Sequence, residues 1–195
     1  MSAPNLFDLS GQVAIITGSS RGIGRAIALR MAEHGARVVI SSRKAEACQA
    51  VADEITAAHG ADRALVVPAN ISSKADLQAL VERTRAHWGR VDTLVCNAAS
   101  NPYYGPQAGI ADEQFRKILD NNIVANHWLI SLVAPEMTAR RSGSIIIVSS
   151  IAGLVAAPAT GPYSMTKHAL EAMGKALRAE LAPLGIDVCL LNPGP

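Results

Sequence analysis

Short runs of β-branched and aliphatic residues alternate with longer amphipathic segments along the whole chain. The apolar runs show no polar alternation, which is typical of strands covered by helices on both faces of a parallel sheet. The longer segments repeat apolar residues at helical spacing. The expected strands are Val13–Thr17, Arg37–Ser41, Ala64–Val67, Thr93–Cys96, Ser144–Ser149 and Asp187–Leu191, and the expected helices are Ile23–Glu33, Ala45–Ala58, Lys74–Trp88, Asp112–Thr138 and Tyr163–Leu181.

This alternation predicts an α/β domain in which helices join parallel strands. Six strands wound in this way form a doubly wound sheet whose strand order reverses near the middle, with helix layers on both faces in a three-layer αβα arrangement. No linker, repeat or low-complexity segment divides the 195 residues, so we expect one domain over residues 1–195. Ligands of such sheets bind beyond the carboxyl ends of the strands.

The composition narrows the choice of partners. Lys and Arg number 18 against 16 Asp and Glu, a balance that favours no nucleic acid. No apolar run reaches membrane-spanning length, and the first nine residues lack the basic and apolar parts of a signal peptide. The cysteines are odd in number and far apart, as in reducing compartments. We therefore expect a cytoplasmic protein that binds neither nucleic acid nor membrane, and the scattered histidines predict no metal site.

A glycine-rich turn follows the first expected strand and leads into a helix. Gly18 permits a tight turn, Gly22 lets the backbone approach a pyrophosphate, and Gly24 lets the helix pack closely on the strand. The free N–H groups and partial positive charge of a helix N-terminus favour an anion at this position. The other residues of the expected phosphate-binding turn are Ser20, Arg21 and Ile23.

The end of the second expected strand bears on the choice of cofactor. A carboxylate there would bind an unphosphorylated adenosine ribose, but the chain has Ser42 followed by Arg43. Arg43 can form charge-assisted hydrogen bonds to a ribose 2′-phosphate, with Arg21 approaching from the glycine turn. We therefore expect NADP(H) to be preferred over NAD(H). The alternative is that Arg43 and Lys44 only solvate an exposed strand end, which leaves the missing acid unexplained.

A tyrosine and a lysine stand four residues apart in the last expected helix. This spacing puts Tyr163 and Lys167 on one helix face, and Ser150 lies upstream at the end of the fifth expected strand. Tyrosine can donate a proton to a carbonyl oxygen, and a nearby ammonium would lower the tyrosine pKa from its usual value near 10. Ser150 can hold and polarise the substrate oxygen. The three residues predict acid–base chemistry at a carbonyl group.

The Gly-x-x-x-Gly-x-Gly spacing, the Tyr-x-x-x-Lys step and the order of strands together resemble the short-chain dehydrogenase/reductase family, in its classical branch. The resemblance implies a Rossmann-like fold and hydride transfer between a nicotinamide and a ketone or 3-oxoacyl carbonyl, or the matching secondary alcohol. It makes Tyr163 the general acid/base, and Lys167 also a ligand of the nicotinamide ribose. Asn122 falls on the fourth catalytic position, where the residue distorts the helix and binds a proton-relaying water, although a one-residue slip to Asn121 stays open.

Three further segments resemble cofactor-binding positions of this family. They follow the third, fourth and sixth expected strands and are Asn70 with Ile71, Asn97 with Ala98 and Ala99, and Pro193 with Gly194. An Asp usually stands at position 70, and the Asn oxygen can still accept a bond from the adenine amino group. Residues 42–44 and 97–105 look like the carbonyl reductase and 3-oxoacyl reductase branches. Tyr103 and Tyr104 either line the substrate mouth or pack within a surface loop.

Other readings of function stay open at this point. The chain could be a regulatory module that binds a nucleotide without turnover, or an extended-type epimerase or dehydratase, which normally opens with Gly-x-x-Gly-x-x-Gly. The family resemblance implies a homodimer or homotetramer, and the fold it resembles continues past the sixth strand, so we expect the C-terminal part to be missing after Pro195. Candidate interface positions are Leu129, Leu132, Ala169, Ala172 and Ala176.

Overall fold

The protein is described by a computed structural model over residues 6–194. Residues 1–5 and Pro195 lie outside the described residues. The first five belong to the stretch in which we expect no signal peptide. The strands are β1 (Val13–Thr17), β2 (Arg37–Ser41), β3 (Ala64–Val66), β4 (Thr93–Cys96), β5 (Gly143–Val148) and β6 (Ile186–Leu191). The helices are α1 (Gly22–Glu33), α2 (Ala45–His59), α3 (Lys74–Trp88), α4 (Asp112–Leu119), α5 (Ala125–Arg140) and α6 (Gly161–Leu181), with short turns η1 (Gln107–Gly109), η2 (Asp120–Val124), η3 (Ile151–Gly153) and η4 (Ala182–Leu184).

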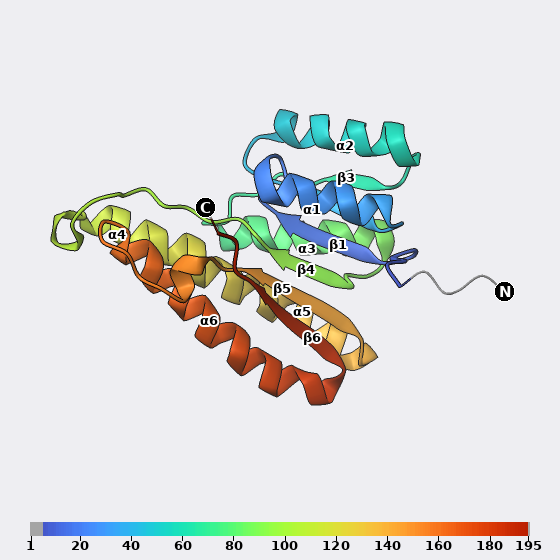
Figure 1. Cartoon of the computed structure of the whole chain (residues 1–195). Helices are drawn as coiled ribbons and strands as arrows, with labels where there is room; N and C mark the ends of the chain where they lie inside the picture. Colours follow the sequence, from blue (N-terminus) through green and yellow to red (C-terminus); the bar gives the residue numbers. More distant parts are fainter. Residues whose placement is uncertain (1–5, 195) are drawn as a thin grey trace.

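All six strands pair in parallel in one sheet, in the order β3-β2-β1-β4-β5-β6 (Figure 1). Helices α1 and α2 cover one face, and α3, α5 and α6 cover the other. The expected three-layer, Rossmann-like α/β fold is therefore confirmed. The chain crosses from β3 at one edge back to β4 beside β1, so the strand order reverses between β1 and β4, where such sheets bind ligands.

The aliphatic strands divide the core into two layers. Successive side chains of a strand point to opposite faces, so Ile15 and Ile16 of β1 belong to different hydrophobic clusters, as do Val39 and Ile40 of β2. All four side chains are fully buried. Burial on both faces explains why these strands contain no polar alternation.

One expected helix differs from the structure. The segment expected as Asp112–Thr138 consists of α4, the π-helical turn η2 and α5, whereas the other expected bounds are shifted by only one or two residues. Within η2 the Ala125 N–H donates to the Asp120 carbonyl five residues back. Pro135 lies inside α5, and there the Arg85 guanidinium donates to the Leu132 carbonyl (2.7 Å).

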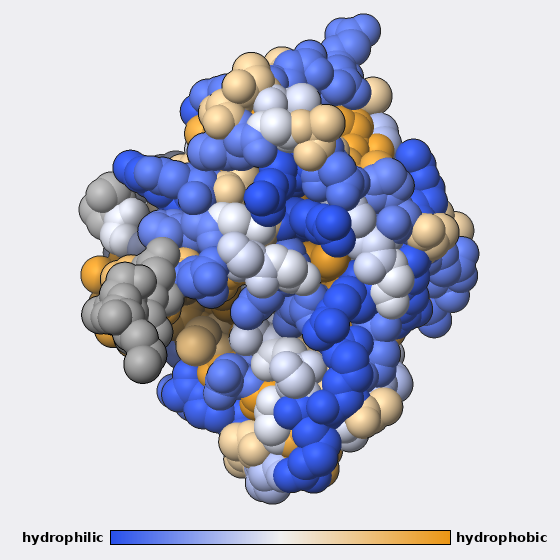
Figure 2. Space-filling view, turned by 90° about the vertical axis from the view of Figure 1, so that its right-hand side faces the viewer, coloured by the Kyte–Doolittle hydropathy of each residue, from blue (hydrophilic) through white to orange (hydrophobic). Residues whose placement is uncertain are grey.

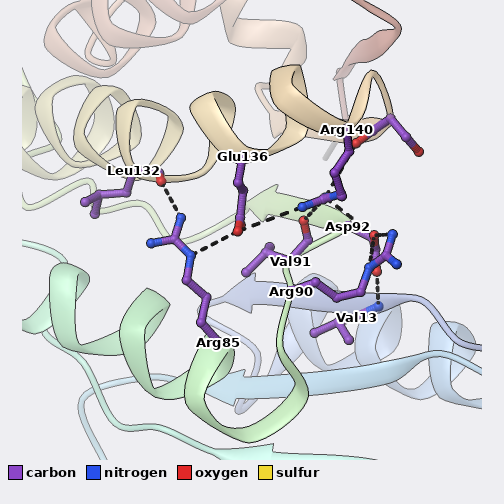
Figure 3. Close-up of polar contacts among 9 residues, drawn as sticks. Val13, Arg85, Arg90, Val91, Asp92, Leu132, Glu136 and Arg140 are labelled. Atoms are coloured by element: carbon purple, nitrogen blue, oxygen red, sulfur yellow. Dashed lines mark hydrogen bonds and ion pairs between the residues drawn. The ribbon is translucent and has the colours of Figure 1, made fainter.

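A charged network joins the helices to the sheet at the amino ends of the strands (Figure 3). Glu136 on α5 pairs with Arg85 of α3, while Arg140 reaches toward Asp92 and donates to the Val91 carbonyl. Asp92 also accepts the Val13 N–H (2.9 Å), which fixes the start of β1. Figure 2 views the molecule from this side, where hydrophilic residues predominate. The network stabilises the end of the sheet opposite to the expected site.

Between residues 6 and 194, no helix combines the length and the apolar character that crossing a bilayer requires. Over that range, His, Cys, Asp and Glu side chains form no group of three or more that could hold a metal ion.

Candidate active site

The glycine-rich turn after β1 has the backbone that its glycines predict. Gly18 (φ +67°) and Gly22 (φ +56°) are both in the left-handed region, which favours glycine. A Cβ on Gly24 would lie 2.5 Å from the Gly18 carbonyl oxygen, so α1 packs directly on the turn. At Gly22 an added Cβ would meet nothing within 4 Å, which leaves open space beside the backbone.

The amino end of α1 faces this space without a capping side chain. Arg21 occupies the N-cap position with extended backbone, makes no side-chain cap, and no acidic residue stands in the first turn. The first N–H groups of the helix and its positive dipole end are therefore available to an anion. These features fit the phosphates of a dinucleotide.

Thr17 and Asn97 join the ends of β1 and β4 beneath the turn. The Thr17 hydroxyl accepts the N–H groups of Asn97 and Ala98, each at 3.0 Å. The Asn97 side-chain amide donates to the carbonyls of Thr17 (2.8 Å) and Gly18 (3.4 Å). The structure thus directs the Asn97 side chain at the glycine turn and leaves Ala98 and Ala99 as small residues beside it. Thr17 was missed from the sequence, and its signal is a hydroxyl ending an aliphatic strand.

The expected 2′-phosphate residues follow two segments that are tied together. The buried Ser19 donates its N–H to the Ser41 carbonyl (3.1 Å), and its hydroxyl accepts the Ser41 N–H (2.9 Å). Arg21 and Arg43 are exposed, and neither forms an ion pair within residues 6–194. The Ser42 hydroxyl contacts the Cys48 thiol at 3.1 Å. The guanidinium groups of Arg21 and Arg43, neither of which has a carboxylate partner among the described residues, therefore follow the two segments that the Ser19–Ser41 bonds hold together.

Asn70 lies in the loop after β3 and is exposed. Its side-chain oxygen accepts the Ser72 N–H (3.2 Å), and its own N–H donates to Asp76 (2.9 Å). One lone pair of the Asn70 oxygen is thus used to shape the loop, and the second remains for a ligand. Ile71 packs partly against the core beneath it.

Ser150, Tyr163 and Lys167 come together between the end of β5 and α6. The Ala152 N–H donates to the Ser150 hydroxyl (3.1 Å), which leaves the Ser150 O–H proton to be donated. Lys167 is only 2% exposed, and its ammonium donates to the Val148 carbonyl (2.8 Å). The same nitrogen lies 5.5 Å from the centre of the Tyr163 ring.

The titration of this pair departs from expectation. Burial raises the pKa of Tyr163, and a hydrogen bond with Ser150 opposes that rise. Burial also lowers the pKa of Lys167 to about 8. The expected lowering of the tyrosine pKa by the ammonium is therefore not found, because the ammonium is bonded to the Val148 carbonyl and lies over the ring.

Asn122 links this cluster to the loop after β4. Its side chain is fully buried, accepts the Ser100 N–H (2.8 Å), and donates to the Ser100 carbonyl and the Thr166 hydroxyl, both at 3.0 Å. Thr166 in turn donates to the Tyr163 carbonyl (2.8 Å). The Asn122 carbonyl, inside the π-helical turn, accepts the Asn126 side-chain amide (2.8 Å). Asn122 is thus hydrogen-bonded toward the tyrosine helix.

Asn121 points to different partners. Its amide donates to the Ser100 hydroxyl (2.9 Å), and its oxygen accepts the Ser72 hydroxyl (2.6 Å). Both asparagines therefore bond to Ser100, but they differ in their second partner. Asn121 bonds to Ser72, whereas Asn122 bonds to Thr166 of α6. The sequence analysis assigned no role to Ser100, Thr166 or Asn126, and nothing in their local pattern marks these polar residues out.

The family model of the short chain dehydrogenases matches residues 12–195. The chain belongs to this family. Dehydrogenase/reductase SDR family member 4 of Rattus norvegicus is 42% identical over 188 residues, which are 95% of this chain and 66% of the relative. The Homo sapiens protein of the same name is 39% identical over 187 residues, again 95% and 66% of the two chains. The chain thus spans slightly less than two thirds of the length of these relatives.

Solved structures of short-chain dehydrogenases match the fold. A metagenomic short-chain oxidoreductase in complex with NADP has a TM-score of 0.90 and 35% identity, over 96% of this chain and 84% of the other. A short-chain dehydrogenase from Streptomyces avermitilis has a TM-score of 0.87 and 31% identity, over 95% and 66% of the two chains. This chain therefore shares the fold of these solved short-chain dehydrogenases.

The loops after β4, β5 and β6 lie at the carboxyl edge of the sheet, where Ser150, Tyr163 and Lys167 come together. The Tyr103 hydroxyl donates to the Pro106 carbonyl (2.6 Å), so Tyr103 packs within its own loop, whereas Tyr104 is 78% exposed. The Pro193 carbonyl accepts the Ile151 N–H (3.0 Å), which holds the turn containing Gly194 against the residue after Ser150. Other exposed apolar side chains of these loops and of the first turn of α6 are Ile151, Leu154, Val155, Met165 and Leu191.

Proposed function

We propose that the protein is an NADP(H)-dependent oxidoreductase that interconverts a small carbonyl compound, of the ketone or 3-oxoacyl type, and the matching secondary alcohol. The observation that carries the proposal is the cluster of Ser150, Tyr163 and Lys167 at the carboxyl edge of the sheet. A serine that can donate, a tyrosine and a buried amine form one acid–base unit. The four residues proposed as catalytic are Asn122, Ser150, Tyr163 and Lys167.

The residues of the chain divide the acid–base work. In reduction, the Ser150 O–H donates to the substrate oxygen and the Tyr163 hydroxyl transfers its proton to that oxygen. A nicotinamide held beside these residues would supply the hydride that adds to the carbonyl carbon. In oxidation the tyrosinate takes the proton back. The Lys167 ammonium, which bonds to the Val148 carbonyl, keeps the tyrosine helix against the end of β5 and would also donate to the ribose of the nicotinamide. Asn122 keeps Thr166, and with it the turn of α6 that carries Tyr163, in place.

Support for NADP(H) comes from the adenosine end. Gly18, Gly22 and Gly24 expose the backbone at the start of α1, and Arg21 and Arg43 remain available to a 2′-phosphate. A similar solved protein is described in complex with NADP. The other proposed contacts are Ser20, Ile23, Ser42, Asn70, Ile71, Asn97, Ala98, Ala99, Pro193 and Gly194.

Free Cys48, Cys96 and Cys189 favour a reducing, cytoplasmic compartment.

The direct test follows NADPH oxidation at 340 nm, the absorption of reduced nicotinamide, with a panel of ketones and 3-oxoacyl esters. We expect saturable turnover with at least one carbonyl compound and formation of the corresponding alcohol. Saturable NADPH binding without oxidation would support a regulatory module and overturn the proposal. Epimerisation or dehydration of a sugar nucleotide without net oxidation would support the extended branch.

A further inference from the structure

Glu171 is a buried acid to which the proposed reaction gives no role. Tyr163, Lys167 and Glu171 follow one another at four-residue steps, so they lie on one face of α6. The side chain of Glu171 is 7% exposed. Burial of a carboxylate is costly unless a hydrogen bond or an opposite charge compensates it. No Lys, Arg or His within residues 6–194 forms an ion pair with Glu171, so hydrogen bonding has to compensate.

The partner of Glu171 is the side chain of Asn192, just after β6. The Asn192 amide nitrogen donates to a Glu171 carboxylate oxygen at 2.6 Å, a short bond of the kind that a charged acceptor forms. The same nitrogen donates to the Ser150 carbonyl at 3.2 Å. An amide nitrogen carries two hydrogens, so both bonds can exist together. Asn192 thus bridges the buried acid and the peptide group of Ser150.

The backbone around Ser150 is otherwise held by the continuation of β6. The Ser149 N–H donates to the Leu191 carbonyl (2.7 Å), and the Ile151 N–H donates to the Pro193 carbonyl (3.0 Å). These bonds hold the residues on either side of Ser150, and the Asn192 amide holds the carbonyl of Ser150 itself. The direction of the Ser150 side chain follows from this backbone, so Asn192 and Glu171 contribute to where the hydroxyl points.

We propose that Glu171 is a positioning residue, which through Asn192 fixes the peptide of Ser150 and thereby the hydroxyl that holds the substrate oxygen. The proposal rests on the proposed function and adds a residue to it. Glu171 touches neither substrate nor cofactor in this scheme. Its carboxylate orients the Asn192 amide, because an acceptor of this strength favours one of the two orientations in which that amide could be placed.

The test compares three variants of the full chain in kinetics and cofactor binding. Glu171→Leu removes the acceptor at similar size, Glu171→Gln keeps an acceptor oxygen, and Glu180→Leu removes an exposed acid of the same helix as a control. We expect Glu171→Leu to lower kcat about 10- to 50-fold, with the Kd for NADPH changed less than about twofold. Glu171→Gln should regain most of the lost kcat, and Glu180→Leu should match the wild type.

A kinetic cycle with Ser150→Ala separates positioning from a general loss of stability. If Glu171 acts through Ser150, Glu171→Leu should lower kcat less than about twofold in the Ser150→Ala background, since the oriented hydroxyl is already gone. The same full loss in both backgrounds would overturn the proposal, as would an unchanged kcat for Glu171→Leu in the wild type. Should Glu171→Leu fail to fold, Asn192→Ala breaks the same bridge, and the same cycle applies to it.

The failure of this proposal can be told apart from the failure of the proposed function. A wild-type protein that binds NADPH but reduces no carbonyl compound overturns both. Wild-type turnover combined with an unaffected Glu171→Leu variant overturns only the role of Glu171.

Discussion

Lys167 places an amine in the interior beside the end of β5, and this placement links the site to the stability of the fold. Burial lowers its pKa from 10.5 to about 8, so at neutral pH the folded state bears the cost of a buried charge. Between pH 8 and 10.5 the unfolded chain binds more protons at this residue than the folded chain does. The free energy of unfolding contributed by Lys167 therefore rises with pH over that window and is lowest below it.

Lys167→Met tests this cost. The variant should gain on the order of 3 kcal/mol of unfolding free energy over the wild type near pH 7, less about 1 kcal/mol for the lost bond to the Val148 carbonyl. The gain should shrink as pH rises through 8 toward 10.5. Urea unfolding of both proteins at pH 7 and pH 10.5 measures it, and a pH-independent difference would contradict the assigned burial.

Tyr163→Phe removes the proposed proton donor and keeps the ring. The ring is partly buried and its hydroxyl bonds with Ser150, so the variant should fold and bind NADPH like the wild type. Turnover should fall at least about a hundredfold, the usual scale for a general acid. Steady-state kinetics with a ketone substrate measures the loss, and retention of more than about a tenth of the wild-type rate would exclude Tyr163 as the proton donor.

At the residue scale, Ser42 and Arg43 are expected to determine the preference for NADPH over NADH. NADPH should bind at least about ten times more tightly than NADH, a difference of about 1.4 kcal/mol. The double substitution Ser42→Asp with Arg43→Leu should reverse that order, because a carboxylate repels the 2′-phosphate and accepts from a free ribose hydroxyl. Calorimetric titration of both cofactors measures it. Arg83→Leu, an exposed arginine of α3, is the matched control, and equal affinities in the wild type would refute the assignment.

The sequence predicts residue types better than side-chain directions. The four-residue step was enough to place Tyr163 and Lys167 on one face of a helix. It could not show that the Lys167 ammonium bonds to the Val148 carbonyl, because that carbonyl lies in another element. For the same reason the sequence did not show that the Asn97 side-chain amide donates to the Thr17 carbonyl in the glycine turn.

At the scale of elements, the π-helical turn η2 is where the structure departs from the single helix that the apolar pattern predicts. The apolar spacing from Asp112 to Thr138 is continuous, so periodicity predicts one helix. In η2 the side chains of Asn121 and Asn122 both bond to Ser100, while Asn121 also bonds to Ser72 and Asn122 to Thr166 of α6. The strands, in contrast, were predictable throughout as aliphatic runs, and the central ones, such as β1 and β4, are buried on both faces.

Two neighbouring substitutions separate the roles in η2. Asn122→Ala should destabilise the fold by about 2–3 kcal/mol, because it removes the partner of the Ser100 N–H and carbonyl and the amide that donates to the Thr166 hydroxyl. It should also lower turnover, since Thr166 holds the carbonyl of Tyr163. Asn121→Ala should cost less than about 2 kcal/mol and spare kcat. A larger loss of kcat in Asn121→Ala than in Asn122→Ala, measured beside thermal unfolding, would favour Asn121 as the residue that serves catalysis.

At the scale of the whole molecule, the sheet separates a structural end from a chemical end. The ion pairs of Arg85, Glu136, Arg140 and Asp92 lie at the amino ends of the strands (Figure 3). The glycine turn, the Ser100 loop and the Ser150 cluster lie at the carboxyl ends, where helices leave backbone N–H groups unpaired. The same connectivity that buries the strands therefore brings residues distant in sequence to one edge.

The surface of α6 carries the last expectation, which concerns self-association. Of the positions first considered, Leu129 is 1% exposed and lies in the protein's own core, whereas Leu132 is only partly buried against it. On α6, Met165, Ala172 and Ala176 are exposed and share one stripe. Small side chains there let a second α6 approach closely.

We therefore expect a homodimer or homotetramer in which α6 helices of two copies pack together. Replacing Ala172 and Ala176 with Glu together should lower the mass in sedimentation equilibrium to that of the monomer, 20.4 kDa for this chain. Charge repulsion and desolvation across the helix pair are the cause. Ala50→Glu on the exposed face of α2 controls for added charge and should leave the assembly intact. A wild-type monomer at micromolar concentration, or an unchanged assembly in the double variant, would remove α6 from the interface.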